Sequence, residues 1–327
     1  MIKVSVIIPV YRVEAFIERC AVSLFSQSLR EAEFIFVDDA SPDNSIAIVK
    51  KCLTKYPERE RQTRIIRHPV NLGISAVRND GLEAAQGEYV YYCDSDDWVE
   101  PEALEKMYRA AGDGAVDIVY CDFFLSFENN ERYMSNPDYS TAEEMLRKGF
   151  LGGKMKYNLW NKLVRRDLYT ENGFRFPEGH SVGEDMLMIR LAATAQTVKH
   201  VPEALYHYVK LNINAYSNSY SQKYLEDIRF NTDLTIDFLQ NRYGEEIERD
   251  LAFFKLSTKL PFLITDDKRM YQVWSEWYPE ANAFANANPD LPGRTRLLQT
   301  MAARGRWWYV KWYYRLVYKL IYGVIFK

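Results

Sequence analysis

Short apolar runs alternate with helical segments along the first 121 residues, and this alternation constrains the fold more than any other feature. The runs have strand length and lie at residues 3–9, 34–37, 64–67, 89–93 and 117–121. Apolar residues at helical spacing, or helix-starting residues, mark the segments between them. A β-α pattern repeated in this way predicts a mainly parallel sheet with helices on both faces.

Polar side chains follow the ends of several of these strands. They are Tyr11, Asp38 and Asp39, Asn71, and Asp94–Asp97. In sheets of this kind, ligands bind at the carboxyl ends of the strands, so the sequence predicts a functional site at that edge. Further along, we expect an irregular, aromatic-rich region at 123–215 and a helical region from about 217 to 290.

The run Asp94-Ser95-Asp96-Asp97 crowds three carboxylates at the end of one strand. Like charges this close oppose folding unless a cation neutralises them. Mg²⁺ and Mn²⁺ prefer carboxylate oxygens and take one or two of them together with substrate phosphates. The alternative is a solvated acidic turn that caps the helix opened by Pro101.

Two other strand ends each admit a functional and a structural interpretation. Asp39 can accept a hydrogen bond from a nucleobase, or form an Asx turn with Asp38. Asn71 and Arg78 can contact phosphate, since arginine suits bidentate contacts, or can belong to an ordinary turn and surface helix.

Outside these strand ends, Glu184-Asp185 supplies a candidate general base. The same pair can simply complement the N-terminal charge of the helix that follows. His207 is a candidate extra metal ligand, but the four histidines show no metal-binding spacing, and a structural role is favoured.

Composition excludes several classes of protein. Hydrophobic residues make up 47% and charged residues 27%, which excludes wholesale disorder. The four cysteines are far apart in sequence and form no CxxC pair, which argues against a disulfide framework or a structural zinc site and favours a reducing compartment. The N-terminus shows no signal-peptide pattern, and no uncharged run reaches the ~18–20 residues that span a bilayer.

Charge is distributed unevenly along the chain. The net charge is −3, yet eight basic residues and no acidic residue follow Asp290. The segment 304–327 combines six of these charges with many aromatic residues and has helical spacing, with Lys311, Arg315 and Lys319 on one face. Such a helix suits the headgroup layer of an anionic membrane. Packing on the protein's own body, or a dimer contact, is the alternative.

Six motifs resemble, in the same order, those of the family 2 glycosyltransferases, the large inverting group with a GT-A fold. They are Val4–Tyr11, Phe36–Ser41, Asn71–Asn79, Tyr92–Trp98, Trp160–Arg165 and Phe176–Asp185. The likeness covers about residues 1–215. It implies a catalytic domain at 1–215, a helical extension at 216–290 and a basic, aromatic membrane-interface tail at 291–327.

The resemblance also implies roles for individual residues. Asp185 is the expected catalytic base, and Asp96 with Asp94 the expected ligands of Mn²⁺ or Mg²⁺, with His207 as a further candidate. The expected nucleotide-sugar site consists of Pro9, Tyr11, Asp39, Asn71, Arg78 and Asp94. The expected acceptor side consists of Trp160, Asn161, Lys162 and Glu184. Many relatives carry an arginine after the base, and Lys210 is its candidate replacement here.

The function implied is an inverting transfer of a sugar from a nucleotide-diphosphate sugar, with a UDP-sugar as the favoured donor. The acceptor is a hydroxyl of a glycan or a lipid-linked molecule, in bacterial surface polysaccharide synthesis. We expect a cytoplasmic enzyme peripherally bound to the inner face of the membrane, with no nucleic-acid partner; the sequence predicts no oligomeric state.

Two other functions stay open. One is a nucleotidyltransferase acting on a sugar phosphate, although its usual glycine-rich loop is missing after the first strand. The other is a non-catalytic nucleotide-sugar-binding protein, which the intact carboxylates oppose. A dehydrogenase is disfavoured because the first β-α turn has no GxGxxG.

Overall fold

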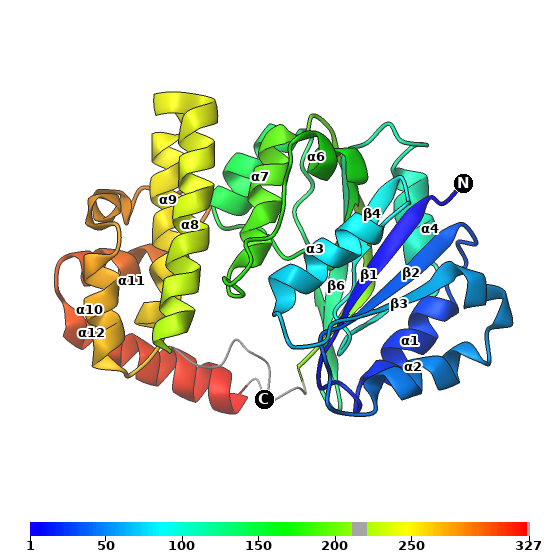
Figure 1. Cartoon of the computed structure of the whole chain (residues 1–327). Helices are drawn as coiled ribbons and strands as arrows, with labels where there is room; N and C mark the ends of the chain where they lie inside the picture. Colours follow the sequence, from blue (N-terminus) through cyan, green and yellow to red (C-terminus); the bar gives the residue numbers. More distant parts are fainter. Residues whose placement is uncertain (211–220, 326–327) are drawn as a thin grey trace. The chain divides into compact units, whose positions relative to one another are not determined.

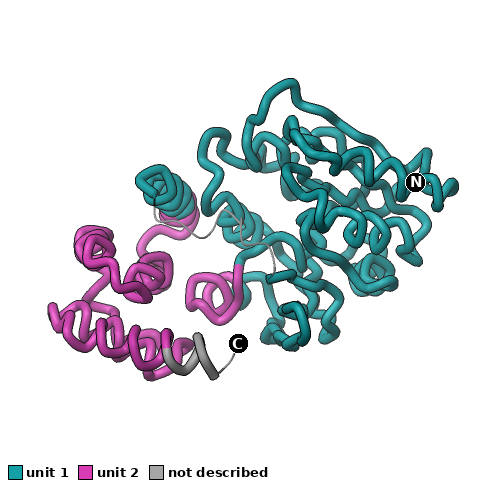
Figure 2. Tube along the Cα trace, turned by 90° about the horizontal axis from the view of Figure 1, so that it is seen from below, with its two compact units in different colours: residues 1–145, 157–235 teal, residues 146–156, 236–327 magenta. Residues whose placement is uncertain are grey.

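The structure is a computed structural model that describes residues 1–210 and 221–325, with side chains up to Lys319. The chain forms two compact units (Figure 2). Unit 1 contains Met1–Met145 and Tyr157–Thr235, and unit 2 contains Leu146–Lys156 and Ile236–Lys327. The functional boundaries expected at 215 and 290 stay predictions.

A single mixed sheet organises unit 1 (Figure 1). Its strands are β1 (Val4–Val10), β2 (Ala32–Asp38), β3 (Thr63–Arg67), β4 (Tyr89–Tyr92), β5 (Trp98–Val99), β6 (Ile118–Ser126), β7 (Glu131–Met134), β8 (Lys162–Arg165) and β9 (Val198–Val209). The strand order is β3-β2-β1-β4-β8-β6-β9-β5, and β7 pairs with β6. The first four strands in this order are parallel, as are β6 and β9. The predicted α/β architecture is confirmed.

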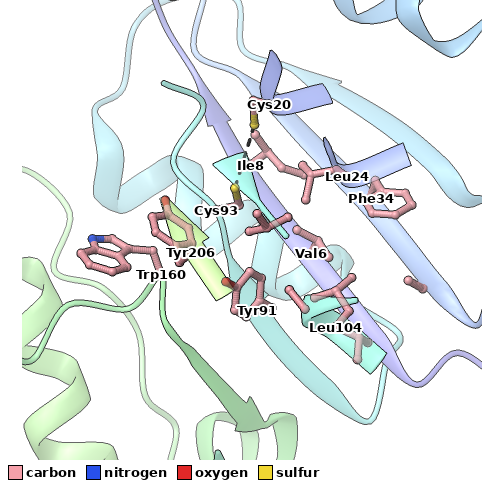
Figure 3. Close-up of a cluster of buried hydrophobic side chains, with 14 of the residues drawn as sticks. Val6, Ile8, Cys20, Leu24, Phe34, Tyr91, Cys93, Leu104, Trp160 and Tyr206 are labelled. Carbon is pink, nitrogen blue, oxygen red and sulfur yellow. Dashed lines mark hydrogen bonds between the residues drawn. The ribbon is translucent and has the colours of Figure 1, made fainter. Parts of the chain in front are cut away.

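Helices cover both faces of this sheet. They are α1 (Ile17–Phe25), α2 (Ser45–Leu53), α3 (Ile74–Ala84), α4 (Ala103–Ala110), the short α5 (Ala142–Glu144), α6 (Arg166–Glu171) and α7 (Leu187–Thr194). Alternate residues of β1, including Val6 and Ile8, join a buried core with Leu24 of α1 and Leu104 of α4 (Figure 3).

The opposite face of β1 packs against α3. A Cβ on Gly81 would lie 2.3 Å from Cγ2 of Ile7, so the helix approaches the strand at a distance that only glycine permits. This close approach fixes α3 against the sheet, and α3 carries Arg78 and Asn79.

The region 123–215 is more regular than its sequence suggests. Strand β6 continues to Ser126, β8 lies between β4 and β6 and is antiparallel to both, and β9 has 12 residues. The expectation of irregular structure is wrong here because these strands pair with partners far away in the sequence. A four-residue strand such as β8 carries too little local pattern to be recognised.

Unit 2 is helical, as predicted. It contains the end of α8 (Gln222–Tyr243), then α9 (Glu248–Lys259), α10 (Lys268–Glu276), α11 (Gly293–Ala303) and α12 (Trp307–Tyr313), which a π-helix continues to Ile325. Trp307 stacks on Tyr271 with ring centroids 5.4 Å apart and meets Trp274 edge to face. These contacts attach the start of the tail to α10.

A fully buried lysine stabilises this arrangement. The Lys259 ammonium donates to the carbonyl oxygens of Trp274, Trp277 and Tyr278, at 2.6–3.3 Å, and to Oδ1 of Asn282. It also lies 4.2 Å from the ring centroid of Trp274. Burial lowers the pKa of Lys259 to about 8, because the ammonium has lost its hydration.

We predict that Lys259→Met destabilises the protein by roughly 2–4 kcal/mol, because several buried acceptors lose their donor. Urea unfolding followed by tryptophan fluorescence measures the effect. The matched control is Lys255→Met, one turn earlier on α9, whose ion pair with the exposed Glu280 should contribute about 0–1 kcal/mol. Equal losses of unfolding free energy in the two variants would show that the buried hydrogen bonds of Lys259 contribute no more than a surface ion pair.

Candidate functional site

The parallel order of β4, β1, β2 and β3 brings their carboxyl ends to one edge of the sheet. Tyr11 is 40% exposed at this edge, beyond β1, and Asn71 is exposed in the segment after β3. Two non-glycine residues here, Arg12 and Ala40, have positive φ angles of 54° and 55°. Backbone strain of this kind persists where the surroundings enforce it, and it concentrates at functional sites.

The first cluster at this edge surrounds the buried carboxylate of Asp39. Its Oδ1 lies 2.7 Å from Nδ1 of His68 and accepts the Leu72 N–H, while Oδ2 accepts the Gly73 N–H. The Asn71 side-chain amide donates to the Asp39 carbonyl at 3.3 Å. Asp39 and Asn71, both predicted from the sequence, are therefore brought together, and Asp39 organises the segment 71–73.

The second cluster gathers carboxylates around the guanidinium of Arg78 on α3. Its Nη1 lies 2.6 Å from Oε1 of Glu184, and its Nη2 lies 3.4 Å from Oδ1 of Asp94. Glu184 begins the 3-10 turn η3 (Glu184–Met186), which follows Gly183 in the left-handed region at φ 81°. Arg78 was predicted to contact the donor nucleotide; here it is 5% exposed and joins two other predicted residues.

The carboxylates outnumber the cation that balances them. Burial, with Asp96 and Asp185 nearby, raises the pKa of Asp94 to about 6 against the opposing charge of Arg78. Burial and Asp185 raise the pKa of Glu184 to about 8. Burial alone would lower the pKa of Arg78, but Glu184 and Asp94 raise it overall. The site thus holds an excess of negative charge that a bound cation would stabilise.

The donor set fits a hard divalent ion held in part by its substrate. Among the residues that the structure describes, no group of three or more His, Cys, Asp or Glu side chains converges as a metal site. Asp94 and Asp96 supply carboxylate oxygens at the end of β4, and Mg²⁺ or Mn²⁺ commonly takes one or two such ligands together with phosphate oxygens. The donor diphosphate would complete the shell.

Asp97 holds the acidic segment in place, a role that the sequence did not reveal. Its carboxylate accepts the Tyr206 hydroxyl at 2.6 Å and the Val209 N–H at 2.7 Å, and the Asp94 N–H donates to that hydroxyl. Burial and the neighbouring Asp96 raise the pKa of Asp97 well above its usual value. The only sign of this role in the sequence is a third carboxylate beyond the two that a metal needs.

His207 is 2% exposed and has both ring nitrogens engaged. Nε2 lies 2.8 Å from Oε1 of Glu100, Nδ1 lies 2.9 Å from Oε1 of Glu131, and the ring stacks on Trp98. None of these partners is Asp94 or Asp96. This geometry favours the structural interpretation of His207.

The acceptor-side candidates Trp160, Asn161 and Lys162, at the start of β8 and just before it, lie inside unit 1. Trp160 stacks on Tyr206 with centroids 4.5 Å apart (Figure 3), and the Asn161 amide donates to the Cys121 carbonyl. The Lys162 ammonium donates to the Asn158 carbonyl and to Asn161, and burial lowers its pKa to about 7.

Lys210, the candidate replacement for the family's arginine, lies 4.0 Å from the ring centroid of Tyr208. Burial lowers its pKa, although the negative charges of Asp97 and Asp96 oppose that effect. Its ammonium therefore interacts electrostatically with those carboxylates of the acidic segment.

The fold is the GT-A fold of glycosyltransferases. The family model "Glycosyl transferase family 2" matches residues 5–179, and the chain belongs to that family. EpsH of Bacillus subtilis, provisionally named a glycosyltransferase, is 33% identical over 259 residues, which are 77% of this chain and 73% of EpsH.

Two solved structures share the fold. TarS 1-349 of S. aureus in complex with UDP-GlcNAc has a TM-score of 0.70 at 24% identity, covering 96% of this chain and 92% of that one. The mannosyltransferase PcManGT of Pyrobaculum calidifontis, in complex with GDP-Man and Mn²⁺, has a TM-score of 0.54 at 18% identity, covering 96% and 83%.

We predict that, without divalent ions, the protein becomes less stable as the pH rises from 5 to 7, below the range in which the buried Lys162 and Lys259 lose their protons. The folded-state pKa values of Asp94 and Glu184, about 6 and about 8, lie above their ordinary values. Their contribution to stability is therefore present at low pH and is lost as the pH rises through those values. Thermal unfolding at several pH values tests this.

Mn²⁺ should raise the unfolding temperature more at pH 8 than at pH 5, because only ionised carboxylates bind it. Asp94→Asn should weaken this gain, whereas the exposed Glu203→Gln should leave it unchanged. A Mn²⁺ effect that is the same at both pH values would contradict the assignment of the ion to these carboxylates.

Proposed function

We propose that the protein is an inverting, metal-dependent glycosyltransferase that moves a sugar from a UDP-sugar to a hydroxyl of a glycan or lipid-linked acceptor. The observation that carries the proposal is the cluster of Asp94, Glu184 and Arg78 at the carboxyl edge of the sheet, with Asp96 and Asp185 adjoining it in the chain. In this proposal Asp94 and Asp96 serve the donor diphosphate, and Asp185 serves the acceptor.

The reaction needs a base because a hydroxyl is a weak nucleophile. Asp185 takes the proton of the acceptor hydroxyl as its oxygen forms a bond to the anomeric carbon. The bond from that carbon to the diphosphate oxygen breaks with the electron pair leaving on the nucleotide, so the anomeric centre inverts in one displacement. A divalent ion on Asp94 and Asp96 would supply charge stabilisation for the leaving diphosphate.

Arg78 keeps Glu184 and Asp94 in fixed positions, so that Glu184 orients the turn that carries Asp185. The donor identity is supported by the fold similarity to TarS 1-349, which was solved with UDP-GlcNAc. One relative, the poly(ribitol-phosphate) beta-glucosyltransferase of Bacillus spizizenii, is 31% identical over 193 residues, and its name supports a polymeric acceptor.

The direct test is a screen of UDP-, GDP- and TDP-sugars for hydrolysis and transfer, with Mn²⁺ present and after chelation. We expect turnover of a UDP-sugar that is lost on chelation and restored by Mn²⁺. Full activity after chelation would overturn the metal dependence, and release of pyrophosphate from a nucleoside triphosphate would favour a nucleotidyltransferase.

We predict that Asp185→Asn lowers turnover by roughly 10²–10⁴-fold and leaves UDP binding nearly unchanged, since a general base acts on the acceptor rather than on the donor. Steady-state kinetics and calorimetry with UDP measure the two effects separately. Glu184→Gln is the matched comparison. If that variant, and not Asp185→Asn, showed the larger loss of turnover with UDP affinity and stability unchanged, the base would be Glu184.

The tail supports a proposal about location. Val310 and Tyr313 are buried against unit 2, whereas Trp308 and Trp312 are 63% and 50% exposed. Leu316 and the basic residues Arg304, Arg306, Arg315 and Lys319 are also exposed. Exposed tryptophan beside basic side chains is typical of helices that lie in the headgroup layer. We propose that this surface binds the anionic inner face of the membrane and brings the enzyme to a lipid-linked acceptor.

No helix among the described residues is both long and apolar enough to span a bilayer. A peripheral contact of the kind proposed depends instead on the exposed tryptophans and on the basic side chains beside them. Its strength should fall with salt, because part of the attraction is Coulombic.

We predict that Trp308→Ser with Trp312→Ser reduces co-sedimentation with vesicles containing anionic lipid at least several-fold, while activity on a soluble acceptor survives. The substitutions avoid Trp307, which packs on α10, so the fold should be kept. Leu297→Ser, a similarly exposed apolar residue on α11, is the control. Unchanged sedimentation of the double variant would remove the membrane proposal.

A further inference from the structure

His68 follows β3 at the same edge of the sheet and has no role in the mechanism above. Its ring is 6% exposed and lies between two carboxylates, with Nδ1 2.7 Å from Oδ1 of Asp39 and Nε2 2.7 Å from Oδ2 of Asp80. Its backbone N–H donates to the Asp38 carbonyl at 2.9 Å. Ring and backbone are thus both fixed beside Asp39.

We propose that His68 is a positioning residue for the donor base: it occupies one oxygen of Asp39 so that a single acceptor direction remains, which selects uracil over guanine. This inference rests on the proposed function, in which Asp39 contacts the nucleobase. It adds the reason why Asp39 can accept only one hydrogen bond from the base.

A count of hydrogen bonds supports the selection. A carboxylate offers about four lone-pair directions. Among the described residues, Oδ1 of Asp39 is used by His68 and by the Leu72 N–H, and Oδ2 by the Gly73 N–H. One direction on Oδ2 is left. Uracil presents one ring N–H between two carbonyls and needs a single acceptor. Guanine presents a ring N–H beside an amino group, and a carboxylate binds that pair well only with two acceptor directions.

The two carboxylates differ in a way that ties His68 to Asp39. The side chain of Asp39 is 5% exposed, whereas that of Asp80 is 44% exposed. Water can replace the histidine at the exposed Asp80 but not at the buried Asp39. Loss of the ring therefore removes one of the two donors to Oδ1 of Asp39 and leaves only the Leu72 N–H.

The charge state of the His68 ring also favours its hydrogen bond to Asp39. Burial alone would lower the pKa of His68, but the hydrogen bonds to Asp39 and Asp80 outweigh it and raise the pKa. A ring that keeps both N–H groups donates to both carboxylates, and Asp39 stays an acceptor for the base.

Three substitutions separate the contacts of His68. The amide nitrogen of asparagine reaches the position of Nδ1, and that of glutamine reaches the position of Nε2. His68→Asn therefore keeps a donor for Asp39, His68→Gln keeps one for Asp80, and His68→Leu keeps neither. Glu83→Gln, on the exposed side of α3 one turn from Asp80, is the control that should change nothing.

The experiment measures UDP and GDP affinity by calorimetry for each variant, together with KM and kcat for a UDP-sugar. We expect His68→Leu and His68→Gln to weaken UDP binding roughly tenfold and to narrow the preference for UDP over GDP. KM for the donor should rise while kcat changes little. His68→Asn should recover most of the UDP affinity and selectivity. Circular dichroism confirms that each variant is folded.

The outcomes distinguish this inference from the proposed function. A wild-type protein that binds neither nucleotide overturns both. A wild-type protein that prefers UDP, with His68→Leu and His68→Gln that keep the same affinity and selectivity, overturns only the role of His68. Equal losses in His68→Asn and His68→Leu would mean that the ring matters for packing and not as a donor to Asp39, and would also overturn the inference.

Discussion

The buried guanidinium of Arg78 is the interaction on which the rest of the site depends. It lies between Glu184 and Asp94, which belong to segments 90 residues apart in sequence, and it is the cation that brings their carboxylates together. A buried ion pair gains little net stability on its own, but removing one partner leaves uncompensated charge and is costly. Here the single cation meets more carboxylates than it can balance. The excess of carboxylates is the feature on which the proposed cation site rests.

Helix α3 extends this constraint from the proposed donor side to the proposed acceptor side. Gly81 lets the helix press against Ile7 of β1, and Asn79 exchanges two hydrogen bonds with the backbone of Phe176, at 2.9 and 2.8 Å. One short helix thus fixes the sheet edge, the segment at 176 and the turn at 184 with respect to one another. Such support from packed secondary structure is what a reaction needs when the acceptor oxygen must meet an anomeric carbon at a set distance.

The sequence predicted those parts of the molecule that local pattern encodes. The β-α alternation was enough for the α/β architecture and for the edge at which Asp39, Asn71 and Asp94 meet, because parallel strands bring their carboxyl ends together. The alternation did not predict β8 and β9, whose partners lie far along the chain. It did not predict the burial of Arg78 either. The hydrogen bonds from Tyr206 to Asp97 and from His207 to Glu100 and Glu131 join strands that are adjacent only in the folded sheet. No spacing rule within one segment could have revealed them.

The tail shows why charge and burial have to be considered together. From composition alone, eight cations without an acid indicate an exposed surface, while the aromatic residues indicate a packed one. The structure reconciles these because α12 has two sides: Trp307, Val310 and Tyr313 pack within unit 2, and Trp308 and Trp312 face outward. The Lys259 ammonium donates a hydrogen bond to the carbonyl oxygen of Trp274, and the ring of Trp274 contacts Trp307. Buried polar contacts therefore help to fix the packed side of α12. A helix held firmly on one side can present rigid tryptophans on the other without the entropy cost of folding at a surface. This preorganisation is the physical basis of the membrane contact that we propose for this short basic segment.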